Sequence, residues 1–298
     1  MIRDYLQLFR AHTGMATVYT LLIPYLFVGG RVFAIPLFVL GLITHYASFG
    51  HNSVSDYYHD LQDENKKHHP LITGRIKYSN AVAVVFYMQM IAGIGLAVIA
   101  LLAHSILSLV FLVIYVVAGH AYNDGLDHQT IHSFIPISIA FSSLTLYSYF
   151  LDGTNVREAI LFFILAFLLI TYQIAYEGNK KDQGHEVNYY SLYGGKIWFE
   201  TLFFVMRVVG DTVLLLMIAP TYLVIAFTPI EIYLVVMSQK ERDHTKMLKY
   251  FGLTEAVEFF RVVSLLNILL AIPLIVIGLA YFMIFNKLLW SDHLLPKV

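Results

Sequence analysis

The stretch that decides the fold and the site runs from His51 to Arg75 and reads HNSVSDYYHDLQDENKKHHPLITGR. It joins the end of one long apolar segment to the start of the next. Asn52, Asp56 and Asp60 are spaced four residues apart, and on a helix this spacing puts them on one face, about 6 Å apart along the axis. Two carboxylates and a carboxamide are hard oxygen ligands of the kind that Mg²⁺ takes.

Basic residues follow the acidic ones within this stretch. Lys66, Lys67 and Arg75 are suited to contact phosphate oxygens directly, and Mg²⁺ usually completes its coordination shell with water and substrate phosphates. The stretch therefore indicates a site for a metal-bridged diphosphate at the edge of a membrane. Taken alone, the same residues also fit a solvent-exposed helix end with ordinary charges.

The composition places most of the chain in a membrane. Of its 298 residues, 58% are hydrophobic and 13% are charged, whereas about 25% are charged in an average soluble domain. The chain has no cysteine, which excludes disulfides and zinc sites built from cysteine. We expect the first apolar segment to remain as a span, because no small-residue cleavage site precedes it. No basic stripe with interleaved aromatic residues indicates a nucleic-acid partner.

A membrane-spanning helix needs about 20 predominantly apolar residues. Nine segments meet this condition: 15–30, 34–51, 80–103, 105–120, 132–151, 157–177, 196–218, 220–238 and 257–286. The sequence therefore predicts an all-α polytopic membrane bundle of about nine transmembrane helices. We expect residues 1–298 to form a single transmembrane domain.

The basic residues are distributed unequally between the two sides of this predicted bundle. The side of the N-terminus carries thirteen: Arg3, Arg10, Lys66, Lys67, Arg75, Lys77, Lys180, Lys181, Lys196, Lys240, Arg242, Lys246 and Lys249. The opposite side carries four: Arg31, Arg157, Lys287 and Lys297. Because cytoplasmic loops are enriched in Lys and Arg, we expect the N-terminus and the long polar loops to form a cytoplasmic cap on a protein of the cell membrane.

A second polar cluster follows the sixth expected span. Residues 173–195 read QIAYEGNKKDQGHEVNYYSLYGG. Asp182 and Glu186 are four residues apart and share a helical face, and Asn179 precedes Asp182 by three. Gly194 and Gly195 then interrupt the segment before the next span. Two acidic clusters on the same side of the membrane are suited to hold two Mg²⁺ ions on one diphosphate.

These motifs resemble the UbiA superfamily of intramembrane prenyltransferases. The family's first motif, N-x-x-x-D-x-x-x-D, corresponds to Asn52, Asp56 and Asp60. Its following segment, N-K-P-x-R-P-x-P-S-G-R, is matched at five positions: Asn65, Lys66, Pro70, Gly74 and Arg75. Its second motif, D-x-x-D-x-x-x-D, is matched in degenerate form by Asn179, Asp182 and Glu186. Arg10-Ala-His-Thr also resembles the opening of the family's first span.

The resemblance implies the transfer of a prenyl group from a prenyl diphosphate to a lipophilic acceptor, with membrane lipid around the protein and Mg²⁺ as cofactor. The implied metal ligands are Asn52, Asp56, Asp60, Asn179, Asp182 and Glu186, with Asp56, Asp60, Asp182 and Glu186 as the catalytic set. The implied substrate-binding residues are Asn65, Lys66, Arg75, Tyr122 and Lys181. In the second motif, Glu177 is an alternative to Asn179 as a metal ligand.

The sequence departs from the family in the loop after the fourth expected span. Many members carry Y-x-x-x-K there, but Tyr122 is followed by Leu126 in the lysine position, and Asp124 and Asp127 lie nearby. These acids would repel a carboxylate on an acceptor. We therefore expect an alcohol or a neutral ring as acceptor, such as a prenylated glycerol lipid whose phosphate binds near Lys180, Lys181 and Lys196.

Two other functions fit the same residues. A transporter of an anionic lipid or metabolite would use polar clusters near the middle of the membrane, and a prenyl-diphosphate hydrolase would use water as the acceptor. Within the seventh expected span, Arg207 and Asp211 are four residues apart. They form either an ion pair inside the bundle or part of an active site.

The charge asymmetry predicts which positions are accessible from outside the cell. Because the chain has no cysteine, single substitutions report cleanly on topology. In intact cells, an impermeant thiol reagent is expected to label Asn155→Cys and to leave Ser79→Cys unlabelled. Labelling of Ser79→Cys from outside, with Asn155→Cys protected, would show that the predicted orientation is inverted.

Overall fold

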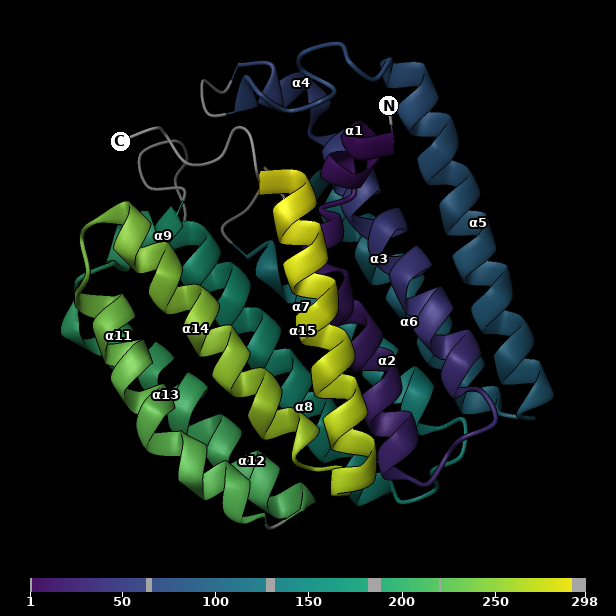
Figure 1. The fold of residues 1–298 in the computed structure, drawn as a ribbon, viewed down its shortest axis with the longest axis vertical. Coiled ribbons are helices and arrows are strands. Elements are labelled where there is room, and N and C mark those ends of the chain that lie inside the picture. Colours follow the sequence, from purple (N-terminus) through teal and green to yellow (C-terminus); the bar gives the residue numbers. More distant parts are fainter. Residues whose placement is uncertain (1, 63–65, 127–131, 182–188, 220, 291–298) are drawn as a thin grey trace. The chain divides into compact units, whose positions relative to one another are not determined.

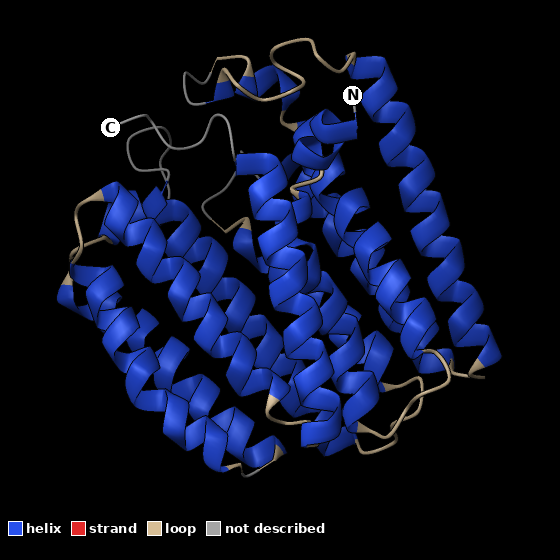
Figure 2. Ribbon diagram, in the orientation of Figure 1, coloured by secondary structure: helices blue, strands red, loops and turns tan. Residues whose placement is uncertain are grey.

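The structure is a computed structural model that describes residues 2–62, 66–126, 132–181, 189–219 and 221–290. Within these residues every regular element is a helix and none is a strand (Figure 2). The predicted all-α class is therefore confirmed. By Cα packing the chain divides into two compact units. Unit 1 comprises Met1–Val113, Tyr147–Asp152 and Pro273–Val298, and unit 2 comprises Ile114–Leu146 and Gly153–Ile272.

Unit 1 is built on helices from the first third of the chain. It contains α1 (Ile2–Leu8), the 3-10 turn η1 (Ala11–Thr13), α2 (Gly14–Phe27), α3 (Ala34–Ser55), α4 (Tyr57–Asp60) and α5 (Tyr78–Leu102) (Figure 1). Three helices have residues in both units: α6 (Ile106–Ala121), α7 (Phe134–Tyr149) and α15 (Ile268–Trp290).

The helices of unit 1 approach one another closely at small residues. α3 packs against both α2 and α5, and a turn that includes Gly29 and Gly30 joins α2 to α3. A Cβ atom added at Gly41 of α3 would lie 2.9 Å from the Cα atom of Val18 on α2. α15 is fixed to the start of the chain, because the Tyr281 hydroxyl donates to the carbonyl oxygen of Ala11 over 2.6 Å.

Unit 2 contains two long helices that include π-helical turns. α8 (Val156–Tyr172) continues into the π-helical η4 (Gln173–Gly178) and α9 (Asn179–Lys181). α11 (Ile197–Phe204) continues through the π-helical η5 (Val205–Gly210) into α12 (Asp211–Ile218). π-helical turns inside α-helices are rare and frequently lie at functional sites. The unit also contains η3 (Tyr122–Leu126), α10 (Tyr189–Tyr193), α13 (Tyr222–Lys240) and α14 (His244–Val263).

An aromatic core holds unit 2 together at the end where η4 lies. Tyr172 and Tyr176 stack with their ring centroids 5.3 Å apart, and Phe199 and Phe203 of α11 pack on them. Phe251 of α14 completes the cluster. This packing fixes the turn of helix that leads from α8 into the second polar cluster.

In the part of the chain that the structure describes, six helical segments are long and apolar enough to cross a membrane: Ala34–Ser55, Tyr78–Leu102, Ile106–Asp124, Val156–Gly178, Ile197–Ile218 and Tyr222–Lys240. Phe134–Tyr149 and Leu269–Phe285 are shorter apolar helices. Except for the last, the nine expected spans correspond to helices, the first of them to the 14-residue α2.

The prediction of a single last span over 257–286 is wrong. The structure has two helices there, α14 and α15, which are separated at residues 264–267. α14 begins at His244, inside a segment that was expected to be a loop, and it packs along α13. Glu255, Glu258 and Arg261 lower the mean hydropathy of this segment. The helix therefore does not stand out as an apolar run in the sequence.

The contact between α2 and α3 predicts a difference between two glycines. Gly41→Ala is expected to lower the free energy of unfolding by about 1–3 kcal/mol, because its methyl group would press on the backbone of Val18. At Gly93 of α5 an added Cβ meets no atom within 4 Å, so Gly93→Ala is expected to be neutral or slightly stabilising. Thermal unfolding in detergent measures both, and equal effects would contradict the close α2–α3 contact.

Candidate active site

The three residues of the first motif are joined directly by the backbone of α3 and α4. The Asp56 amide donates to the carbonyl oxygen of Asn52 over 2.9 Å, and the Asp60 amide donates to that of Asp56 over 2.8 Å. These i to i+4 bonds continue the helix through the junction at Asp56. The three side chains therefore follow one another on one face, as the four-residue spacing predicts.

The two carboxylates of the motif are buried in the protein. Asp56 is 7% exposed and Asp60 is 6% exposed. The side-chain amide of Asn52 donates to Asp56 Oδ2, and Lys66 Nζ lies 3.4 Å from Asp60 Oδ1. Buried carboxylates held beside a cation and an amide form an oxygen-rich donor set of the kind that suits Mg²⁺.

The segment that follows the motif is anchored by two apolar residues. Leu71 and Ile76 are buried in a cluster with Leu8, Phe9 and Val85. Between these anchors the chain turns back on itself, because the Ile76 amide donates to the carbonyl oxygen of Pro70 over 3.1 Å.

The turn itself is made by Gly74. This residue has a φ of 70°, a left-handed conformation that glycine adopts without a steric cost. The turn thereby fixes the basic residues on either side of it near the motif.

Arg75 is held by several acceptors of unit 1. Its Nη1 lies 2.9 Å from Asp4 Oδ1, and its Nη2 donates to the carbonyl oxygen of His68 over 2.7 Å. The side chain remains 42% exposed, and that of Lys66 is 35% exposed. Both cations are thus positioned by the fold and accessible to an anionic ligand from solvent.

Arg10 and His69 belong to this region, although neither was included in the predicted site set. Arg10 adopts a left-handed backbone conformation with φ 46°, which costs a non-glycine residue about 1–2 kcal/mol. Its carbonyl oxygen accepts a hydrogen bond from Thr13 Oγ1 over 2.9 Å, and its guanidinium lies 5.4 Å from the centre of the Phe49 ring. The Arg10-Ala-His-Thr sequence was the only signal that could have marked this residue.

His69 is an uncharged member of the region at neutral pH. It stands where the family's N-K-P-x-R-P segment has its arginine. Burial lowers the pKa of His69 to about 4; the Asp60 carboxylate acts in the opposite direction, and the positive charges of Lys66, Arg10 and Arg75 add to the lowering. The sequence alone gave no signal that this histidine is buried.

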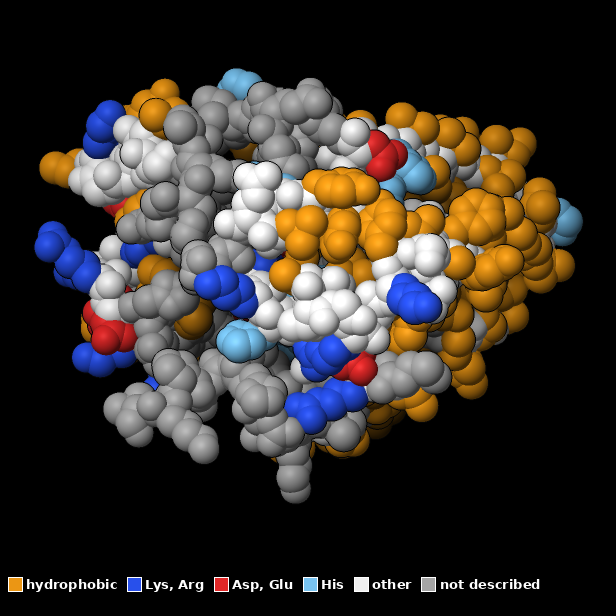
Figure 3. Space-filling model, turned by 90° about the horizontal axis from the view of Figure 1, so that it is seen from above, with side chains coloured by type: hydrophobic (Ala, Val, Ile, Leu, Met, Phe, Trp, Pro, Cys, Tyr) orange, Lys and Arg blue, Asp and Glu red, His pale blue; other side chains and the backbone are white. Residues whose placement is uncertain are grey.

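Figure 3 looks down on the end of the helices at which α1 and α4 lie. Lys, Arg and His side chains are visible on this end. Hydrophobic side chains cover the flank along which α5 runs. Exposed apolar residues of α5 include Phe86, Tyr87, Ile91, Ile94 and Leu102, and such a surface suits contact with lipid chains.

The second cluster is described in part. Glu177 is 3% exposed at the end of η4, and the side-chain amide of Asn179 donates to the carbonyl oxygen of Ala175 over 3.0 Å. Tyr122 opens η3 in the same unit. Three site residues named from the sequence, Asn65, Asp182 and Glu186, lie outside the described residues, as does the side chain of Lys181.

Lys180 does not face an approaching phosphate, contrary to its expected role near the acceptor. Its Nζ donates to the carbonyl oxygens of Ser238 and Gln239 over 2.6 and 3.0 Å, and it is 4% exposed. These carbonyls belong to the last turn of α13, where a cation is favoured by the helix dipole. Burial lowers the pKa of Lys180. Lys196, in contrast, is exposed and lies 5.0 Å from the centre of the Tyr193 ring.

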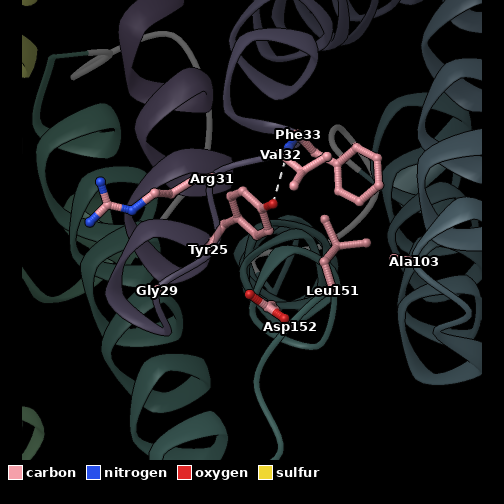
Figure 4. A pocket seen from close by; sticks show the side chains of 8 residues that line it. All are labelled: Tyr25, Gly29, Arg31, Val32, Phe33, Ala103, Leu151 and Asp152. Carbon is pink, nitrogen blue, oxygen red and sulfur yellow. Dashed lines mark hydrogen bonds between the residues drawn. The ribbon is translucent and has the colours of Figure 1, made fainter.

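Unit 1 also has a pocket of about 370 Å³ at the turn between α2 and α3 (Figure 4). Arg31 and Asp152 lie on it, and the Phe33 amide donates to the Tyr25 hydroxyl over 3.0 Å beside it. The pocket is next to the start of α3, whereas the motif is at the end of this 22-residue helix. It therefore does not form part of the motif region.

The low pKa of His69 predicts a pH dependence of stability. Unfolded histidine has a pKa of about 6.5, so between pH 6.5 and about 4 the unfolded chain binds a proton that folded His69 does not. The free energy of unfolding is therefore expected to fall as the pH is lowered through this window. His69→Gln should flatten the decline in metal-free detergent solution, whereas His68→Gln, at an exposed position, should not. If the free energy of unfolding declines equally with pH in the wild type and in His69→Gln, the low pKa of His69 is contradicted.

Comparisons with known proteins identify the family and the fold. The model of the UbiA prenyltransferase family matches residues 14–254. None of the curated proteins searched is significantly similar in sequence. Among solved structures, a digeranylgeranylglyceryl phosphate synthase is 17% identical, with a TM-score of 0.62 and coverage of 96% of this chain and 100% of the other.

Two archaeal structures share the same fold. A UbiA homolog from Aeropyrum pernix K1 is 16% identical, with a TM-score of 0.60 over 90% of this chain and 98% of the other. A UbiA homolog from Archaeoglobus fulgidus, bound to GPP and Mg²⁺, is 14% identical, with a TM-score of 0.58 over 96% of this chain and 99% of the other. Together with its apolar helices, the match over more than half of its length shows that this chain is an integral membrane protein of the UbiA prenyltransferase family.

Proposed function

We propose that the protein transfers a prenyl group from a prenyl diphosphate to a lipophilic acceptor within the membrane. The observation that carries the proposal is the continuous helical connection of Asn52, Asp56 and Asp60, with both carboxylates buried beside Lys66. A relative of this fold binds GPP and Mg²⁺, which supports the same class of substrate here. The membrane location supplies the apolar surroundings that a prenyl chain requires.

The residues of the first motif fit Mg²⁺. Asn52, Asp56 and Asp60 would hold the ion through side-chain oxygens, since Mg²⁺ prefers such ligands and keeps open positions for water and phosphate. The chemistry that Mg²⁺ supplies in such a site is neutralisation of the charge on the departing diphosphate. In the second cluster, Asp182, Glu186 and either Glu177 or Asn179 provide the corresponding oxygen ligands in this proposal.

The cations of unit 1 bind and orient the diphosphate. Lys66 offers a mobile ammonium, and Arg75 offers a guanidinium whose position is fixed by Asp4 and His68. Hydrogen bonds from both to phosphate oxygens are charge-assisted, and they strengthen as negative charge accumulates on the leaving group. Neutral His69 adds no further positive charge at neutral pH.

The reaction breaks the bond between the allylic C1 carbon and the diphosphate oxygen, and the electron pair leaves with the diphosphate. C1 then forms a bond to a nucleophilic atom of the acceptor, which releases a proton. We propose an alcohol or a neutral ring as acceptor, such as a glycerol lipid, because Asp124 is exposed in η3 and would repel a carboxylate. Exposed Lys196 remains available for a phosphate group of such a lipid.

Asp56→Ala is expected to abolish prenyl transfer while leaving a folded protein, because it removes a carboxylate from the proposed metal site. EDTA should have the same effect on the wild type, with recovery on addition of Mg²⁺. The assay uses purified protein, radiolabelled geranylgeranyl diphosphate and a panel of acceptors: a glycerol ether lipid, a hydroxybenzoate and a neutral phenol. Asp152→Asn, an exposed position away from the motif, is the matched control and should retain full transfer.

Transfer that persists in EDTA would overturn the metal-dependent proposal. Transfer to the hydroxybenzoate alone would overturn the proposed acceptor class and leave prenyl transfer intact. Transfer to none of the acceptors, with diphosphate still released, would identify water as the acceptor and a hydrolase as the correct function.

A further inference from the structure

Unit 2 contains a buried ionic cluster that the proposed reaction does not use. It is formed by residues of η5, α12, α13 and α14: Arg207, Asp211, Glu231, Glu255, Glu258 and Arg261. The side chains of Arg207, Asp211, Glu231 and Arg261 are 0% exposed, and that of Glu258 is 5% exposed. Glu255 lies at the edge of the cluster, with its side chain 34% exposed. Ionisable residues inside spanning helices are costly and usually functional.

Arg207 is at the centre of one half of the cluster. Its Nη1 lies 3.7 Å from Asp211 Oδ2, its Nε lies 3.3 Å from Glu231 Oε1, and its Nη2 lies 3.4 Å from Glu255 Oε1. Glu255 also accepts a hydrogen bond from the Gln173 side chain. The ion pair between Arg207 and Asp211, one of two alternatives predicted from the sequence, is thus part of a larger network.

Arg261 links the same acids from the other side. Its Nη1 contacts Glu231 Oε2 and lies 2.9 Å from Glu258 Oε2. Its Nη2 donates to Thr212 Oγ1 over 2.7 Å. One arm of its guanidinium is therefore directed at a neutral hydroxyl group and not at a carboxylate.

The charges of the cluster do not balance. Three buried carboxylates, of Asp211, Glu231 and Glu258, share two guanidinium groups, so the ionised buried cluster carries one excess negative charge. The partly exposed Glu255 adds a second negative charge at its edge. Oxygen atoms of Asp211, Glu231 and Glu258 all lie within 4.8 Å of one another. At such distances, away from water, like charges repel strongly, so the excess charge must be neutralised.

Some of these oxygens also lack hydrogen bonds. Asp211 is fully buried, and among the described residues neither of its carboxylate oxygens accepts a hydrogen bond. Its ion-pair distance of 3.7 Å to Arg207 is too long for one. Glu258 Oε1 is also without a hydrogen-bond donor in the described part of the chain. Buried polar atoms without partners are uncommon and indicate a missing ligand, such as an ion or water.

We propose that Asp211, Glu231 and Glu258 bind one divalent cation inside unit 2. One such ion offsets the excess negative charge of the three buried carboxylates, and Glu255 at the edge of the cluster balances the remaining positive charge. The donors are all carboxylate oxygens, which favour a hard cation such as Mg²⁺ or Ca²⁺. Their mutual spacing is compatible with a shared ion, since ligand oxygens about 2.1–2.4 Å from a metal lie roughly 3–4.8 Å apart.

This site differs in kind from the proposed substrate site. Its three ligands come from α12, α13 and α14 and are shielded from solvent, so it requires no substrate phosphate. The ion joins three helices and stabilises the folded state by its binding free energy. It is therefore expected to remain when the motif ligands have been removed.

The test uses the full-length protein, purified in detergent, with the motif ligands removed by Asp56→Asn, Asp60→Asn, Asp182→Asn and Glu186→Gln. After equilibration with Mg²⁺ or Ca²⁺ and removal of free ion, elemental analysis should find one equivalent of metal per chain. EDTA should remove it and lower the melting temperature by roughly 5 °C. Adding Asp211→Asn or Glu258→Gln should abolish both the bound metal and the EDTA effect, whereas Asp152→Asn should change neither.

Absence of bound metal in the motif-deficient protein would overturn the proposal and indicate that protons neutralise the carboxylates. The proposal would also be overturned if one equivalent of metal remained bound both in the Asp211→Asn variant and in the Glu258→Gln variant. If one of these variants does not fold, the metal content of the other variant tests the proposal. The EDTA response of the parent protein is independent of both variants, and no change in its melting temperature would also overturn the proposal.

Discussion

A hydrocarbon environment offers no hydrogen bond to a buried charge, and this constraint decides where the protein places its ionised side chains. In unit 1 the carboxylates lie at the end of α3, where backbone, amide and basic groups are available to them. In unit 2 they lie between helices and are paired with two fully buried arginines. The two arrangements have different consequences: the first leaves cations accessible to a ligand, and the second encloses its charges.

The geometry of the motif region in unit 1 depends on apolar packing. Leu71 and Ile76 bury the segment after the motif against α1 and α5, and the turn at Gly74 returns the chain between them. Arg75 can then reach both Asp4 and the His68 carbonyl. Pre-positioned donors of this kind stabilise a departing anion without reorganising during the reaction. The positions of the basic residues proposed to bind a diphosphate therefore depend on a small hydrophobic cluster.

The sequence was sufficient to predict the all-α class, because long apolar runs admit few other structures in a membrane. It also predicted the alignment of Asn52, Asp56 and Asp60, since a four-residue spacing is a local property of a helix. It did not predict α14. Glu258 and Arg261 of that helix are buried in an ionic cluster with residues of α12 and α13, and the sequence pattern of the helix alone does not show such pairing. For the same reason the burial of Lys180 on the last turn of α13 and the neutrality of His69 emerged only from the fold.

In the proposed reaction, departure of diphosphate is coupled to formation of a new bond on a lipophilic acceptor. The most direct measurement is the ratio of diphosphate released to prenylated acceptor formed, in proteoliposomes supplied with prenyl diphosphate, acceptor and Mg²⁺. Coupled transfer predicts a ratio of one to one and no diphosphate release when the acceptor is withheld. Release without an acceptor, or accumulation of intact prenyl diphosphate inside the vesicles, would contradict it.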